Sequence, residues 1–371
     1  MSRHTRELAW RAELDARTAQ GLRRRQQENR FASQQVINFS SNDYLGLSQA
    51  DAVKNAFQEG VNQYGAGSGA SPLVTGFYPA HQKLVSQLCD WLNKPCALLF
   101  SSGFSANQAL LFTLLQREDV VLQDKLNHAS LLEAGQLSPA TQWRFRHNDM
   151  RDLEKRLQRH MPLLTITEGV FSMDGDKAPL TEMAQLCADA DSMLMVDDAH
   201  AIGVLGEQGE GSAAEITPDI TLVTFGKALG VHGAAILCDE LVYDYLLQYA
   251  RHYTYSTAMP PAQAMAVSAA IECAQTEHWR REKLQALSAC FYETLDSTIH
   301  APITETAIKP VIIADTVQCL AVSEQLKGLG FHVSAIRPPT VPTSRLRITL
   351  TASHTAQQVI ALCQALNRIL S

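Results

Sequence analysis

Ile220-Thr-Leu-Val-Thr-Phe-Gly-Lys227 is a largely apolar run that ends in a glycine and a lysine. An earlier run, Met193-Leu-Met-Val196, ends in Asp197-Asp-Ala-His200. Short runs of this kind are typical of strands that are buried on both faces of a sheet. Enzymes with open α/β sheets keep their chemistry at the carboxyl ends of such strands. We therefore expect functional residues where these two runs end.

Further apolar runs alternate with helix-like segments along the first two thirds of the chain. These runs cover residues 97–100, 120–122, 163–167 and 234–237. The alternation predicts a largely parallel sheet with helices on both faces. Residues 262–298 are expected to form one long helical region that links two lobes, because they contain no proline. The apolar runs at 310–313, 333–336 and 346–350 predict a smaller α/β lobe.

The chain is expected to have three parts. Residues 5–28 interleave charged and apolar side chains, which is typical of a surface helix. We predict an N-terminal helical arm with the start of the small lobe at 1–40, a large cofactor-binding domain at 41–275, and a small C-terminal α/β domain at 276–371.

The composition and charge of the chain argue against nucleic-acid and membrane partners. With 371 residues, 46% of them hydrophobic and 19% charged, the chain is long enough to bury a large core. Its formal net charge of -7 argues against a nucleic-acid or anionic-membrane partner. No apolar segment approaches the ~20 residues of a membrane helix, and the first 25 residues lack an apolar signal core. We therefore expect a cytoplasmic protein.

The eight cysteines are scattered and form no C-x-x-C pair. This argues against a zinc site and against a disulfide framework. We expect buried thiols.

The lysine and the acid that follow the two opening runs suit pyridoxal phosphate. That cofactor needs an amine for a Schiff base, here Lys227, and an acid beside its ring nitrogen, here Asp197. A carboxylate ~4 Å from a protonated nitrogen gains roughly 4 kcal/mol at an effective dielectric of ~20. His200 would then hydrogen-bond the ring hydroxyl. Taken singly, Lys227 is interpreted as a solvated lysine at a strand end and Asp197 as a helix cap. Only the two residues together favour the cofactor.

A metal site at Asp197, Asp198 and His200 is a competing interpretation. No further ligand cluster stands at helix or hairpin spacing, so we expect no metal.

The segment Ser101-Ser-Gly-Phe-Ser-Ala-Asn107 follows a predicted strand and opens a helix. Gly103 is expected to make a tight turn that leaves backbone N–H groups free for a phosphate, with Thr224 adding a hydroxyl. His128 is expected to stack on a flat cofactor ring, or else to cap a helix. Ser172 and Glu168 end another predicted strand, and for Glu168 the choice between cofactor contact and loop structure stays open.

Six segments, taken in order, resemble the α-oxoamine synthases, which are fold-type I, aminotransferase-like pyridoxal phosphate enzymes: Phe39-Ser-Ser-Asn-Asp-Tyr-Leu-Gly46, Gly65-Ala-Gly-Ser-Gly69, Asn127-His-Ala-Ser130, Thr167-Glu-Gly-Val-Phe-Ser-Met-Asp-Gly175, Val196-Asp-Asp-Ala-His200 and Thr224-Phe-Gly-Lys227. Within that family, residues 256–261, 336–342 and 345–349 most resemble the branch that serves biotin synthesis. The one departure from the family pattern is Asn127, where serine is the commoner residue.

The resemblance implies roles for single residues. It implies that Lys227 forms the Schiff base, that His128 stacks on the ring, and that Asp197 and His200 contact its nitrogen and hydroxyl. It assigns further cofactor contacts to Gly103, Phe104, Ser172 and Thr224, and substrate contacts to Arg23, Asn42, His128, Thr340 and Arg347. We expect Arg347 to bind the amino-acid carboxylate, because a guanidinium matches both oxygens. Arg337 and Arg345 remain competitors, and Arg23 reads equally as part of a solvated helix.

The resemblance also implies the reaction. It implies a decarboxylative condensation of L-alanine with a pimeloyl thioester, carried by CoA or by a carrier protein. Glycine with acetyl-CoA or succinyl-CoA, and serine with a long acyl-CoA, remain alternatives, as does a non-catalytic subunit of the same fold. A homodimer is implied, with Ser256 and Thr257 reaching into the neighbour's site.

Overall fold

The computed structural model describes residues 1–20, 22–24, 26 and 36–370. The chain divides into two units, Met1–Ile37 and Asn38–Ser371. The first unit contains α1 (Arg3–Ala19), whose N-cap Ser2 accepts a hydrogen bond from the Thr5 N–H at 3.2 Å. The helix predicted over 5–28 therefore ends earlier than expected. Residues 21, 25 and 27–28 of that prediction lie outside the described residues.

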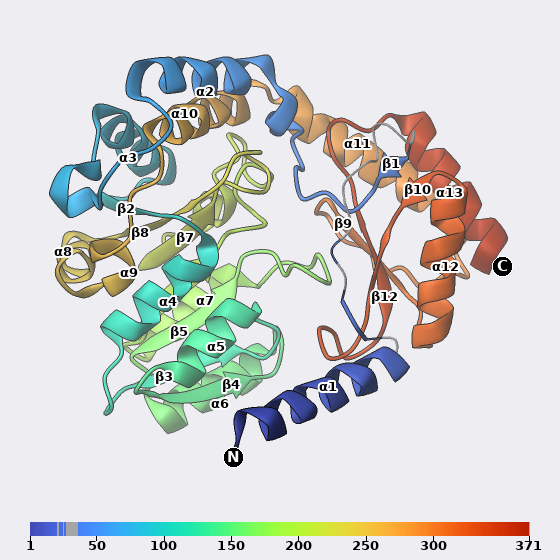
Figure 1. Cartoon of the computed structure of the whole chain (residues 1–371), viewed down its shortest axis with the longest axis horizontal. Coiled ribbons are helices and arrows are strands. Elements are labelled where there is room, and N and C mark those ends of the chain that lie inside the picture. Colours follow the sequence, from blue (N-terminus) through green and yellow to red (C-terminus); the bar gives the residue numbers. More distant parts are fainter. Residues whose placement is uncertain (21, 25, 27–35, 371) are drawn as a thin grey trace. The chain divides into compact units, whose positions relative to one another are not determined.

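The second unit is built on a seven-stranded sheet, as described by the residues that the structure places (Figure 1). Its strands are β2 (Cys96–Phe100), β3 (Val120–Asp124), β4 (Thr141–Phe145), β5 (Leu164–Glu168), β6 (Met193–Asp197), β7 (Ile220–Thr224) and β8 (Ala234–Cys238), in the order β2-β8-β7-β6-β5-β3-β4. Among these strands, β8 alone runs opposite to the others, so its pairs with β2 and β7 are antiparallel. The largely parallel sheet is confirmed. The prediction missed β4, because this edge strand is mostly exposed and its sequence is not continuously apolar.

Two apolar layers cover the two faces of this sheet. Successive residues of a strand point to opposite faces, so Val121 belongs to one layer and Leu122 to the other. The first layer is completed by α4, α5, α8 and α9, and the second by α6 and α7. The helices of this region are α2 (Asp51–Tyr64), α3 (Pro79–Leu92), α4 (Gly103–Leu114), α5 (Ala129–Leu137), α6 (Met150–His160), α7 (Leu180–Asp189), α8 (Glu240–Tyr249), α9 (Arg251–Thr254) and α10 (Pro261–Thr276).

A smaller antiparallel sheet follows in the last third of the chain. It has the order β11-β12-β9, with β9 (Ile308–Ile312), β11 (Ser334–Ile336) and β12 (Arg345–Thr349). The remaining strands and α-helices of the described residues are β1 (Ile37–Asn38), β10 (Phe331–His332), α11 (Trp279–Thr294), α12 (Thr316–Gly328) and α13 (Ala356–Leu370). The Phe39 carbonyl accepts from the Thr349 N–H at 2.8 Å. Residues 39–44 are thereby held against β12.

The single long helix expected over 262–298 was wrong. The chain leaves the helical conformation at Glu277, with φ -92° and ψ 63°, so α10 and α11 are separate. Two arginines after the break bind carbonyls of distant segments. Arg280 Nη1 donates to Leu45 O at 2.7 Å, and Arg281 Nη2 donates to Glu207 O at 2.5 Å. These contacts fix the new direction of α11.

All eight cysteines are free, five of them buried and three half-buried. In the described part of the chain, no helix is both long enough and apolar enough to cross a membrane.

Candidate active site

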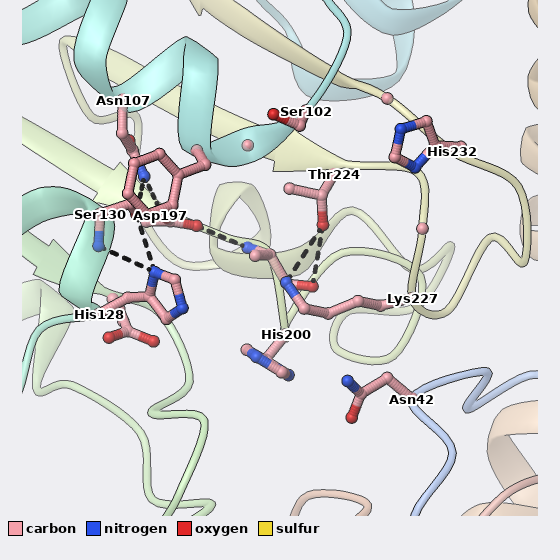
Figure 2. Close-up of a pocket in the computed structure, with 16 residues that line it drawn as sticks. Asn42, Ser102, Asn107, His128, Ser130, Asp197, His200, Thr224, Lys227 and His232 are labelled. Atoms are coloured by element: carbon pink, nitrogen blue, oxygen red, sulfur yellow. Dashed lines mark hydrogen bonds between the residues drawn. The ribbon is translucent and has the colours of Figure 1, made fainter. Parts of the chain in front are cut away.

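Most of the sequence-predicted residues meet at one cavity beside the carboxyl ends of β5, β6 and β7 (Figure 2). Its lining residues are Asn42, Ser102, Gly103, Phe104, Asn107, His128, Ser130, Glu168, Asp197, Ala199, His200, Thr224, Gly226, Lys227, His232 and Gly233. Eight of the residues predicted for cofactor or substrate are among them. The strand-end rule therefore located the cavity correctly.

Lys227 extends from the loop between β7 and β8. Its Nζ lies 3.4 Å from Thr224 Oγ1. Burial lowers the pKa of the lysine, and the nearby Asp197 and Glu168 only partly oppose this effect. A larger fraction of the amine is therefore neutral and able to act as a nucleophile or base. The loop turns sharply at Gly230, where φ is +66° and a Cβ would come within 2.2 Å of the Ser48 nitrogen.

Asp197 ends β6 and is nearly buried, with 5% of its surface exposed. Asn107 Nδ2 donates to its Oδ2 at 3.0 Å, and the Ala199 N–H donates to its Oδ1 at 3.0 Å. The same Asn107 amide group donates to Ser130 Oγ at 2.9 Å. Asn107 was not predicted as a site residue. The available signal was its place in the quoted Ser101–Asn107 segment, one turn of helix after Gly103.

His128 is the N-cap of α5. Its Nδ1 accepts from the Ser130 N–H at 3.2 Å and lies 2.8 Å from Ser130 Oγ. The residue thus caps a helix and faces the cavity, so the two sequence interpretations are compatible. Burial lowers the pKa of His128, opposed by the charge of Asp197. A neutral imidazole ring is suited to stacking on a planar ligand.

His200 is buried after β6 and is connected to the smaller sheet. Its Nδ1 lies 2.7 Å from the Tyr44 hydroxyl, which also lies 3.2 Å from Asn42 Oδ1 and 3.3 Å from Arg347 Nη2. Burial, followed by the charges of Lys227 and Arg347, holds the pKa of His200 well below its usual value. Tyr44 was not predicted, although it lies within the quoted Phe39–Gly46 segment.

The start of α4 lines the cavity, but Gly103 does not make the tight turn that the sequence predicted. The residue is helical and makes no left-handed turn. A Cβ at Gly103 would lie 2.7 Å from Thr224 Cγ2, so its small size allows β7 to approach the helix. Ser102 caps the helix by accepting from the Ser105 N–H at 3.2 Å. As the first helical residues, Gly103 and Phe104 have no intrahelical partner for their N–H groups.

Arg347 lies on β12 and is buried. Its Nε donates to Ser172 O at 2.5 Å, and its Nη1 donates to Asn42 Oδ1 at 3.0 Å. Arg345 instead forms an ion pair with Asp174. Of these two arginines, Arg347 is the one that reaches a lining residue, Asn42.

Three further predicted residues do not line the described cavity. Ser172 is buried and touches the site through its carbonyl oxygen, which holds Arg347. Thr340 is exposed in the loop between β11 and β12. Arg23 belongs to the first unit, where it is exposed and its Nη1 donates to Thr18 Oγ1 at 3.3 Å.

Glu168, left open by the sequence, is a lining residue at the end of β5. Only 3% of its surface is exposed, and its Oε1 has no hydrogen-bond partner among the described residues. Burial and the charge of Asp197 raise the pKa of Glu168 well above its ordinary value. Both effects favour the protonated form of this carboxyl group.

Comparison with known proteins identifies the family. The family model for aminotransferase class I and II matches residues 34–366. The 8-amino-7-oxononanoate synthase of Vibrio atlanticus (strain LGP32) is 58% identical over 334 residues, which cover 89% of this chain and 83% of the relative. The synthase of Photobacterium profundum is 53% identical and covers 96% of both chains. The chain belongs to the 8-amino-7-oxononanoate synthase family.

Solved structures agree with this family. A serine palmitoyltransferase from S. paucimobilis with a bound pyridoxal phosphate–myriocin aldimine has a TM-score of 0.85 and 30% identity, covering 90% of this chain and 87% of that chain. The 8-amino-7-oxononanoate synthase from Francisella tularensis has a TM-score of 0.81 and 29% identity, covering 90% and 98%. The predicted fold-type I architecture and the family resemblance are confirmed.

The lining residues of this family member fit pyridoxal phosphate. An amine, a buried carboxyl group and the start of a helix surround one cavity, and these are the groups needed for an aldehyde, a ring nitrogen and a phosphate. Asn107 Oδ1 and Glu168 Oε1 are buried without partners among the described residues, as expected beside a polar ligand. No cluster of three or more metal-ligating side chains occurs within the residues that the structure places.

Proposed function

We propose that this protein is a pyridoxal phosphate-dependent acyltransferase that condenses L-alanine with a pimeloyl thioester to give 8-amino-7-oxononanoate. The acyl donor is pimeloyl-CoA or pimeloyl carrier protein, and carbon dioxide and the free thiol carrier leave. The reaction belongs to biotin biosynthesis and takes place in the cytoplasm. One observation carries the proposal: Lys227, Asp197 and the start of α4 line one cavity in a chain 52–58% identical to synthases of this name.

The cofactor would be held at four points. Lys227 would bind its aldehyde carbon, and the N–H groups of Gly103 and Phe104, with the Thr224 hydroxyl, would hold the phosphate. Asp197 would pair with the ring nitrogen. His128 would contact the ring face and His200 the ring hydroxyl. Ser172 would be a further cofactor contact. When bound, the cofactor supplies an electron sink for the amino-acid Cα.

Proton transfer is assigned to Lys227. With the cofactor and amino acid bound, its amine would take the Cα proton and would later return a proton to the product. Burial favours this role because it lowers the pKa of the amine. Asp197 would pair with the protonated ring nitrogen, and Asn107 holds the Asp197 side chain in place.

Arg347 is assigned to the carboxylate of L-alanine. Its guanidinium is oriented by Ser172 O and Asn42 Oδ1, and Asn42 itself lines the cavity. We assign Arg23 and Thr340 to the acyl donor on the family resemblance alone.

The domain division and assembly are part of the same proposal. Residues 41–275 would act as the cofactor-binding domain and 276–371 as the smaller domain, with 1–40 as the arm. We infer a homodimer in which Ser256 and Thr257, both exposed after α9, reach the neighbour's site.

The test is a reconstitution of the reaction. Purified protein is mixed with pyridoxal phosphate, L-alanine and pimeloyl-CoA, and carbon dioxide, free thiol and product mass are measured. Glycine and serine, with acetyl-, succinyl- and long-chain acyl-CoA, serve as competing substrates. Lys227→Ala should keep cofactor binding by phosphate and ring but abolish turnover. Faster turnover of glycine or serine, or normal turnover by Lys227→Ala, would overturn the proposal.

A further inference from the structure

The segment that follows β5 joins the large sheet to the smaller one. We call residues 169–177 the bridging loop. Toward the smaller sheet, its Ser172 carbonyl oxygen accepts from Arg347 Nε at 2.5 Å, and its Asp174 pairs with Arg345. Thr306 Oγ1 donates to Gly175 O at 2.8 Å. The position of this loop therefore sets the direction of the Arg347 guanidinium.

The opposite side of the bridging loop is held by one histidine. His147 follows β4, and its Nε2 lies 2.8 Å from Oδ2 of Asp176 in the loop. Its Nδ1 lies 3.0 Å from Oδ1 of Asp124, which ends β3 and is fully buried. The edge of the ring also contacts Phe171 of the loop, with centroids 4.4 Å apart at 88°. His147 thus connects the bridging loop to the end of β3 in the large sheet.

Both ring nitrogens of His147 face carboxylate oxygens, which can only accept. Both nitrogens must then carry a proton, so the ring is an imidazolium cation. Burial lowers the pKa of His147, but the hydrogen bonds and charges of Asp124 and Asp176 outweigh it and raise the value to about 10. Asn148 adds to the connection, since its Nδ2 donates to Asp176 Oδ2 at 2.8 Å and to Lys177 O at 3.1 Å.

We propose that His147 is a positioning residue for the amino-acid substrate. By linking Asp176 of the bridging loop to Asp124 of the large sheet, it fixes the Ser172 carbonyl oxygen and so aims Arg347 toward Asn42 and the cavity. The inference rests on the proposed function, because it takes Arg347 as the carboxylate ligand. Nothing in this role requires contact between His147 and substrate.

The experiment measures L-alanine binding in holoenzyme that carries His147→Gln. Binding is followed by the absorbance of the bound coenzyme, together with kcat and KM for L-alanine and pimeloyl-CoA. Displacement of a substrate ligand by a distant change is expected to weaken L-alanine binding and raise its KM by roughly tenfold. The KM for pimeloyl-CoA and the affinity for pyridoxal phosphate should stay within about threefold of wild type.

The pH profile provides a readout that a merely structural role would not move. The higher L-alanine affinity of wild type over His147→Gln should disappear as the pH rises toward about 10, because the His147 imidazolium then loses its proton. Using the ratio of the two affinities cancels the titration of L-alanine itself. A ratio that stays constant up to that pH contradicts the inference.

Asp176→Asn is the second variant, because Asp176 is 36% exposed and its loss spares the buried Asp124. Asp176→Asn should show the same selective rise in the KM for L-alanine, and it provides the test if His147→Gln does not fold. Arg156→Ala is the matched control: it removes the 2.9 Å ion pair with Asp152 on α6, a pair that lies apart from the bridging loop in sequence and forms no ion pair with it. If both His147→Gln and Asp176→Asn bind L-alanine with unchanged affinity, this inference is overturned and the proposed function is not. Failure of wild type to bind L-alanine would overturn the proposed function and this inference with it.

Discussion

Replacing Lys309 by methionine is expected to stabilise the protein at neutral pH and to destabilise it at strongly alkaline pH. Lys309 lies on β9 with 0% of its surface exposed. Its Nζ donates to Thr304 O at 2.7 Å and lies 4.8 Å from the centre of the Tyr292 ring. No carboxylate pairs with it among the described residues. Burial lowers its pKa from 10.5 to about 7.

The pKa shift makes stability depend on pH. The unfolded chain protonates this amine below about pH 10.5, whereas the folded protein keeps it neutral down to about pH 7. Between these values the unfolded state binds more protons, so the free energy of unfolding falls as the pH is lowered. At about 1.4 kcal/mol for each pKa unit, the loss at pH 7 is at most about 5 kcal/mol.

Methionine keeps an apolar chain of similar length and removes this loss. It also removes the hydrogen bond to Thr304 O and leaves that carbonyl without its lysine partner, which costs about 2 kcal/mol. We therefore expect Lys309→Met to be about 3 kcal/mol more stable than wild type at pH 7 and about 2 kcal/mol less stable near pH 10.5. The two stability curves should cross.

The assay is urea unfolding of the apoprotein, followed by tryptophan fluorescence at several pH values from 7 to 10.5. Lys327→Met, at an exposed lysine of α12, reports the effect of removing one positive charge from the surface. A difference between Lys309→Met and wild type that does not change with pH would refute the reasoning.

Three further predictions concern the cavity. Asp197→Asn should lower kcat about a thousandfold, the equivalent of roughly 4 kcal/mol between close charges, when turnover of L-alanine and pimeloyl-CoA is assayed. Asn107→Ala removes the 3.0 Å hydrogen bond to that carboxylate and should lower kcat/KM by about thirtyfold, since a bond to a charged group contributes roughly 2 kcal/mol; an unchanged value would assign Asn107 to structure only. Tyr44→Phe separates His200 from Arg347 and should raise the KM for L-alanine by about tenfold, measured against an unaltered KM for pimeloyl-CoA.

Local patterns were sufficient to predict that Lys227 and Asp197 lie at one cavity. Lys227 and Asp197 each follow an apolar run, and parallel strands bring their carboxyl ends to one edge of a sheet. Such a pattern is set by residues that are neighbours in the sequence, so it can be recognised without the structure. The same reasoning failed for the join of α10 and α11, because Arg280 and Arg281 bind carbonyls of segments far away in the sequence.

Contacts between distant segments explain what was missed. Tyr44 meets His200 across 156 positions, and Asn107 meets Asp197 across 90. Neither polar residue stands at a strand end, so no spacing rule singles it out. The competition between Arg345 and Arg347 has a similar origin. They are two residues apart on β12 and share a face, and only their partners, Asp174 for one and Asn42 for the other, distinguish them.

The two carboxyl groups of the cavity, Asp197 and Glu168, differ in their hydrogen bonds, and this difference explains why Asp197 suits a cationic ring. Asp197 accepts hydrogen bonds from Asn107 and Ala199, whereas Glu168 Oε1 has no partner in the described residues. Two like charges in one buried site disfavour each other, and hydrogen bonds from donors favour the charged form of a carboxyl group. The charge of Asp197 accordingly adds to burial in raising the pKa of Glu168. A raised pKa favours the protonated form of Glu168, which donates a hydrogen bond as glutamine does, so Glu168→Gln should preserve most of the turnover of L-alanine and pimeloyl-CoA that Asp197→Asn removes.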